Sequence, residues 1–173
     1  MNHIKFTFKL TECNGWPKIR VLVDNDLYED RQFTSEFDNI TVPIEVLDGD
    51  HNLSIELYGK IINNTIVDKQ GNILKDQLVE LLDIYVDDIK LPEWFTYLGT
   101  YVANNTTYPQ AKVWGGNGVW NWSFSTPLII WILDKKVEDE ERHNPPAKSE
   151  LIKWKELVEK YKEFERLLGD TND

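Results

Sequence analysis

The chain has 173 residues, of which 41% are hydrophobic and 28% charged, and its net charge is −11 at pH 7. This length suits a single domain with a full hydrophobic core. The acidity argues against nucleic-acid binding, which needs clustered Lys and Arg, and against an anionic membrane surface; no run of about 18 apolar residues is present to span a bilayer.

Alternation of apolar and polar residues dominates the first two-thirds of the chain and is typical of half-buried strands. It predicts strands over residues 4–10, 19–23, 40–46, 53–57, 78–91 and 120–124. The apolar run PLIIWIL (127–133) is interpreted as one further, buried strand. Turn signals such as NGWP (14–17), DND (24–26) and KQGN (69–72) separate these runs. The pattern predicts an antiparallel β-sandwich of jelly-roll type over residues 1–136.

Two stretches break the simple alternation. The adjacent pair Leu81–Leu82 and the phase change at Asp87–Asp88 predict a bulge or a bend. The stretch AKVWGGNGVWNWSFS (111–125) is interpreted as a hairpin around GGNG. In that hairpin Trp120 and Trp122 point into the core, and Trp114 lies on the opposite side.

The pattern changes after Lys136. Residues 137–148 are acidic and then Pro-rich, which indicates an exposed linker, and residues 149–168 return to a helical period with Ser149 as a plausible N-cap. The helix carries apolar residues at alternating spacings of three and four: Trp154, Leu157, Tyr161, Phe164 and Leu168. Either this stripe packs on the sandwich, or the helix docks on a partner or on a second copy.

No recognisable catalytic motif is present, so we expect no catalytic residues and no enzymatic activity. The three histidines, His3, His51 and His143, are far apart in the sequence. Acidic pairs are frequent in turns, and they keep a hydrolase as a distant third hypothesis.

The acidic turn DNDLYED (24–30) offers the oxygen ligands that calcium prefers, with Asp24 and Asp26 as candidates. The single cysteine, Cys13, excludes an internal disulfide and favours a reducing compartment.

Four aromatic residues lie in or beside turns and loops: Trp16, Trp94, Tyr108 and Trp114. A sugar ring can stack its C–H face on such a side chain, while Asn, Asp and Gln bind its hydroxyls. Alternatively, each aromatic folds back over the edge of the core. The sequence leaves both interpretations open.

A resemblance appears at PKIRVLVDNDL (17–27), DGDHNLSIELYGK (48–60) and LLDIYVDDIKL (81–91). The order of these strand edges resembles that of calcium-dependent xylan-binding carbohydrate-binding modules, which are jelly-roll sandwiches. It is also similar to small proteins of tailed bacteriophages of the T4-like, marine type. The modules hold calcium with loop acids and backbone oxygens, and Asp24 and Asp26 occupy loosely comparable positions.

Two main hypotheses for function follow. The first is a non-enzymatic phage structural or accessory protein, which assembles on a virion or binds a protein partner through helix 149–168. It implies a location in the virion or the host cytoplasm, and the alternating N-terminus is unlike a signal peptide. The alternative is a carbohydrate-binding module that recognises a polysaccharide through loop aromatics, with calcium as a candidate cofactor.

Overall fold

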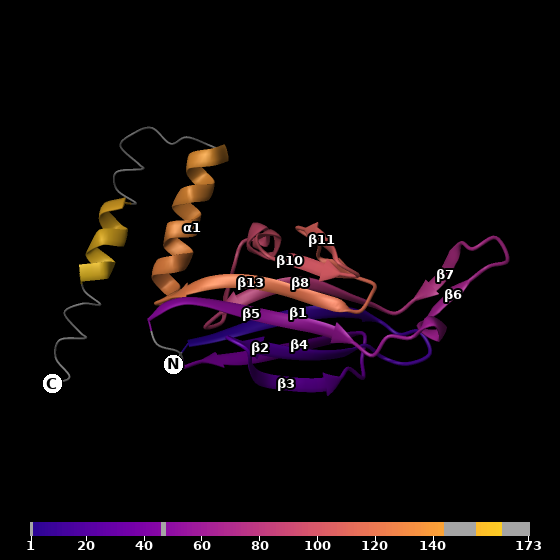
Figure 1. Cartoon of the computed structure of the whole chain (residues 1–173). Coiled ribbons are helices and arrows are strands. Elements are labelled where there is room, and N and C mark those ends of the chain that lie inside the picture. Colours follow the sequence, from indigo (N-terminus) through magenta and orange to yellow (C-terminus); the bar gives the residue numbers. More distant parts are fainter. Residues whose placement is uncertain (1, 46–47, 144–154, 164–173) are drawn as a thin grey trace. The chain divides into compact units, whose positions relative to one another are not determined.

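The computed structural model describes residues 2–45, 48–143 and 155–163 (Figure 1). Its contacts divide the chain into two units. The first comprises residues 1–46 and 50–124, and the second comprises residues 47–49 and 125–173.

Most strands of the chain form two antiparallel sheets. The first sheet has the order β12 (Val113–Trp114), β8 (Leu78–Val86), β1 (Asn2–Thr11) and β4 (Phe37–Ile44), with β9 (Ile89–Lys90) also paired to β8. The second has the order β11 (Thr106–Pro109), β10 (Thr100–Ala103), β13 (Gly118–Thr126), β5 (Gly49–Tyr58), β2 (Lys18–Val23) and β3 (Asp26–Gln32). The predicted antiparallel β-sandwich is confirmed.

A separate two-stranded hairpin consists of β6 (Thr65–Val67) and β7 (Ile73–Asp76). Two 3₁₀ turns complete the first unit: η1 (Ile62–Asn64) precedes the hairpin, and η2 (Glu93–Leu98) follows β9. Figure 1 shows the hairpin projecting beyond the ends of the two main sheets.

The alternating residues of the strands form the core between the sheets. Ile4, Phe6, Phe8 and Leu10 of β1 are buried, as the period-two pattern predicts. The ring of Phe6 meets Trp120 and Trp122 of the opposite sheet edge-on, with centroids 6.1 and 6.3 Å apart. The inward orientation predicted for Trp120 and Trp122 is therefore confirmed.

The irregular strand 78–91 also behaves as predicted. Thr7 of β1 pairs with Asp83, but the next residue, Phe8, pairs with Leu81, so Leu82 is the extra residue of a bulge. Asp87 and Asp88 both have positive φ, and they form the tight turn between β8 and β9.

Trp114 does not occupy the position that the hairpin interpretation predicts. Its strand β12 pairs with β8 in the first sheet, whereas β13 lies in the second, so the GGNG segment crosses between sheets. Trp114 is 0% exposed and stacks on Tyr101 with ring centroids 5.4 Å apart. The interpretation was wrong because a Gly-rich link between two short apolar strands fits a sheet-to-sheet crossover as well as a hairpin.

In the second unit, the strand prediction for residues 127–133 is wrong. Helix α1 spans Leu128–His143, which also makes residues 137–143 of the predicted linker helical. Leu128, Trp131 and Ile132 are buried at helical spacings of three and four. A short apolar run fits a strand or a buried helix equally well, and here the charged residues that follow continue the helix.

Residues 155–163 of the predicted C-terminal helix are helical. Val158 is buried, whereas Leu157 and Tyr161 are exposed, so the stripe facing the protein differs from the predicted one. Lys155 pairs with Glu141 and Lys162 with Asp134, which joins this segment to α1. Trp154, Phe164, Leu168 and residues 144–148 lie outside the described residues. No helix among the described residues is long and apolar enough to cross a membrane.

Candidate functional site

A pocket of about 180 Å³ lies where several segments of the first unit end. The turn 14–17 between β1 and β2 forms one wall, the last residues of β3 and β5 form another, and η1 contributes a third. The lining includes two aromatic rings, Trp16 and Tyr58, and four amide side chains, Asn14, Gln32, Asn64 and Gln77. No carboxylate is among the described residues that line it.

The Trp16 turn adopts a backbone conformation suited to its residues. Asn14 and Gly15 have φ of 51° and 126°, a region that Asn tolerates and Gly adopts freely. The Glu12 carboxylate accepts a hydrogen bond from the Gly15 N–H at 2.8 Å, and it also pairs with Lys75. The hydrogen bond from Gly15, followed by the contact with Lys75, lowers the pKa of Glu12.

Three amide side chains hold the same turn by its carbonyl oxygens. Asn64 Nδ2 donates to the carbonyls of Cys13 and Asn14 at 2.9 and 3.1 Å. Gln77 Nε2 donates to the carbonyl of Gly15 at 2.8 Å, and Gln32 Nε2 donates to the carbonyl of Trp16 at 3.0 Å. Every carbonyl from residue 13 to residue 16 therefore has a side-chain donor, and the turn is held in place before any ligand arrives.

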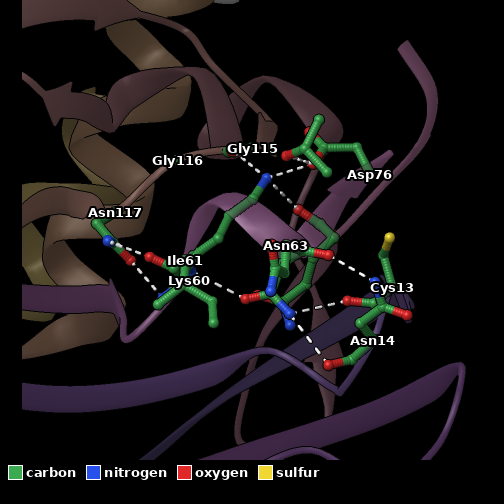
Figure 2. Close-up of polar contacts among 12 residues, drawn as sticks. Cys13, Asn14, Lys60, Ile61, Asn63, Asp76, Gly115, Gly116 and Asn117 are labelled. Carbon is green, nitrogen blue, oxygen red and sulfur yellow. Dashed lines mark hydrogen bonds and ion pairs between the residues drawn. The ribbon is translucent and has the colours of Figure 1, made fainter. Parts of the chain in front are cut away.

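The Lys60 network fixes the neighbouring wall of the pocket (Figure 2). Lys60 Nζ lies 2.5 Å from Asp76 Oδ1 and donates to the carbonyls of Gln77 and Gly115. The amide of Asn117 pairs with the N–H and the carbonyl of Lys60 at 2.8 and 2.9 Å. These bonds tie the end of β5 to the start of β8 and to the Gly-rich crossover.

Tyr58 is oriented by charged neighbours on the outer face of the second sheet. Its hydroxyl donates to Asp30, and the guanidinium of Arg20 lies 4.1 Å from its ring centroid. The hydrogen bond to Asp30 raises the pKa of Tyr58, and the same bond, with Arg20, lowers the pKa of Asp30. The ring is thus held at the pocket as a neutral phenol.

The predicted aromatic residues do not form one platform. Trp16 lines the pocket, whereas Trp94 is half-buried in η2 and stacks on Phe95 at 4.0 Å, and Tyr108 is exposed on edge strand β11. Trp114 is fully buried, so the prediction that it offers a face to a ligand is wrong. Tyr58 and the amides were missed because polar residues at strand ends carry no distinctive sequence pattern.

Asp24, one of the two predicted calcium ligands, has hydrogen-bond partners within the protein. Asp24 Oδ2 lies 2.6 Å from His51 Nδ1, and Oδ1 accepts the Asn52 N–H at 2.9 Å. The bond from Asn52, then that from His51, lowers the pKa of Asp24. This carboxylate thus ties the β2–β3 turn to β5, and Asp26 begins β3 as an exposed residue. Among the described residues, no group of three or more His, Cys, Asp or Glu could hold a metal ion.

The sequence matches no protein-family model and no curated protein. Two solved structures resemble the chain at 13% identity: the module vCBM60 in complex with galactobiose, at a TM-score of 0.46, and a selenomethionine form of vCBM60, at 0.48. The alignment with the galactobiose complex covers 69% of this chain and 96% of that module. The alignment with the selenomethionine form covers 70% of this chain and 90% of that module. The second is described with calcium-dependent carbohydrate-binding modules. With TM-scores below 0.5, these similarities carry no weight for the function of this chain.

Proposed function

We propose that this chain is a non-catalytic carbohydrate-binding protein that holds one sugar unit or one chain end beside Trp16. The observation that carries the proposal is the convergence of the rings of Trp16 and Tyr58 with amide side chains on one small pocket. Aromatic faces bind the C–H face of a sugar, and amides bind its hydroxyls. Gln32 and Gln77 each have a second N–H beyond the one that holds the turn, whereas both N–H groups of Asn64 are already used.

The size of the pocket limits what it can bind. Sites for drug-sized ligands have volumes of roughly 300–1,000 Å³. A pocket of about 180 Å³ is smaller than these and suits a single ring. Because the Trp16 turn is already held by the amides of Asn64, Gln77 and Gln32, binding costs little ordering of the protein.

Binding to a glycan array, followed by calorimetric titration, tests the proposal. We expect Trp16→Ala to weaken binding at least tenfold, because the stacking surface is lost. Trp94→Ala is the matched control, since Trp94 is also half-buried but does not line the pocket. Absence of any glycan ligand, or equal affinity of wild type and Trp16→Ala, contradicts the proposal.

A chelator separates this pocket from the calcium-dependent mode that the sequence resemblance implies. The pocket has no carboxylate among its described lining residues, so we expect unchanged affinity in excess EDTA. Loss of binding in EDTA, restored by calcium, would instead place the glycan at a calcium site elsewhere on the chain.

The phage hypothesis remains a prediction, together with a virion or host-cytoplasm location and docking by helix 149–168. Light scattering of the full chain with variant Leu157→Lys or Tyr161→Lys tests the helix, because both residues are exposed. If the helix mediates assembly, these substitutions lower the molar mass; an unchanged mass contradicts that role.

A further inference from the structure

Residues 61–76, which we call the arm, expose an unusual amount of apolar surface. Six large aliphatic side chains are exposed, from 39% at Ile66 to 89% at Ile62; the others are Ile61, Val67, Ile73 and Leu74. Soluble monomers rarely leave contiguous apolar patches of more than a few hundred Å² uncovered. The arm therefore has the composition of an interaction surface.

The arm is rigidly built in spite of this exposure. At its tip, Asp68 Oδ1 accepts the N–H groups of Gln70 and Asn72 at 2.8 Å, and Oδ2 accepts the Asn72 side chain. At its base, Asp76 accepts the hydroxyl of Thr65 and pairs with buried Lys60. An isolated two-stranded hairpin is marginal in water, so these anchors present the apolar side chains at a low entropic cost for binding.

The outer edges of β6 and β7 are open. These two strands pair with each other and with no further strand of the described chain. An uncovered strand edge is a template for pairing with another strand, and most proteins protect such edges with charge or proline. The arm thus combines unpaired backbone groups with apolar side chains.

Charge indicates what the arm binds. It contains two acids, Asp68 and Asp76, and two lysines, Lys69 and Lys75, so its net charge is zero on a chain of −11. A neutral surface cannot steer a charged partner, but it lets two strongly acidic chains approach each other. Because the arm projects roughly 15–20 Å at strand rise, it keeps the acidic bodies further apart than the ~8 Å screening length in physiological salt.

The exposed area also fits contact between two arms. The six side chains together expose on the order of 700 Å², against the ~800 Å² per partner of a specific interface, and because successive strand residues point to opposite faces, each face of the hairpin carries only part of this area. A two-fold contact uses the same patch on both copies and needs no second surface. We propose that the arm of one chain pairs with the arm of a second copy of this chain to form a symmetric dimer.

Sedimentation velocity of the full chain tests this dimer. Standard interfaces of about 1,600 Å² have dissociation constants of micromolar or tighter, and for the smaller arm a series from about 1 to about 100 µM covers weak association as well. We expect Ile73→Lys to raise the dissociation constant at least tenfold. Ile89→Lys is the matched control, because Ile89 on β9 is 61% exposed and Ile73 is 65% exposed. A monomeric wild type at all concentrations overturns the proposal, and so does equal weakening by both substitutions.

Salt and cross-linking give independent readouts. Raising salt from about 0.05 to about 0.5 M should leave the dimer unchanged or strengthen it, since screening relieves repulsion between acidic chains. A dimer that weakens in salt instead indicates docking of the arm on an acidic face and overturns the symmetric contact.

Under mild oxidation, Leu74→Cys should form covalent dimers and Ile89→Cys should not; the native Cys13 is buried. Equal cross-linking of Leu74→Cys and Ile89→Cys contradicts the proposal even if Ile73→Lys fails to fold.

Discussion

Gly99 lies against the indole of Trp120, at the centre of the aromatic core. A Cβ atom at this position would approach three ring atoms of Trp120 to 2.2–2.3 Å, and Trp120 is fully buried. The absence of a side chain at one residue therefore allows the stacked rings of Trp120 and Trp122 to lie where they do.

We expect Gly99→Ala to lower the free energy of unfolding by about 1–3 kcal/mol or more, since 1–3 kcal/mol is the usual cost of overpacking a core. Gly116→Ala is the control, because a Cβ at Gly116 meets nothing within 4 Å and its φ is unremarkable for an L-residue. Urea unfolding of the two variants measures the difference. Equal stabilities would mean that the Trp120 ring can shift at little cost.

Trp114 also acts through packing. We expect Trp114→Ala to lower the free energy of unfolding by about 3–5 kcal/mol, as for other buried large-to-small substitutions, and to leave glycan affinity of the folded fraction unchanged. Val113→Ala, at the exposed neighbouring residue, should change stability by less than about 0.5 kcal/mol. Thermal unfolding and calorimetric titration separate the two effects. A selective loss of binding in Trp114→Ala would contradict a purely structural role.

At the scale of elements, Lys60 joins segments that the two sheets alone would not hold together. Its side chain is 8% exposed, its partner Asp76 is 15% exposed, and together they connect β5, β7 and the Gly-rich crossover. Both the base of the arm and a wall of the pocket depend on this pair.

We expect Lys60→Met to destabilise the protein by about 3–5 kcal/mol, because it leaves the largely covered Asp76 carboxylate without its cation. Lys75→Met breaks the exposed pair with Glu12 and should cost less than about 1 kcal/mol. Chemical unfolding of both variants checks the contrast. Similar small losses would show that water reaches Asp76 and screens its charge.

At the scale of the whole molecule, hydrogen bonds lower the pKa of five carboxyl groups: Glu12, Asp24, Asp30, Asp68 and Glu93. A carboxyl with a lowered folded pKa stabilises the fold fully above its unfolded value. That stabilisation is lost as the pH falls through the folded pKa, because the unfolded chain then binds more protons.

We therefore expect the melting temperature to decrease as the pH falls below the ordinary pKa values, 4.5 for Glu and 3.8 for Asp. Glu12→Gln keeps an acceptor for the Gly15 N–H but cannot titrate, so the variant should lose less stability between pH 5 and pH 3 than wild type, a window that brackets those values. Calorimetric melts across this range test the prediction. An identical pH dependence of the variant would exclude Glu12 as a contributor.

The local patterns predicted the sandwich well, and particular residues show why. Ile4, Phe6 and Phe8 alternate because one face of β1 is buried, and the adjacent pair Leu81–Leu82 records the bulge in β8. The run 127–133 was misread because a strand and a buried helix share the same short apolar pattern. Trp16 was predicted from its turn, but its pocket partner Tyr58 was not.

The sequence by itself determined the strand-rich class, the inward faces of β1 and β13, and the acidity of the surface, because each depends on neighbours along the chain. The tertiary structure decided the rest. Only sheet pairing places Trp114 in the core, and only the meeting of strand ends brings Trp16, Tyr58 and Gln77 to one pocket. At the pocket, the hydrogen bond from Gln77 to Gly15 joins residues 62 positions apart, a separation that no local periodicity records.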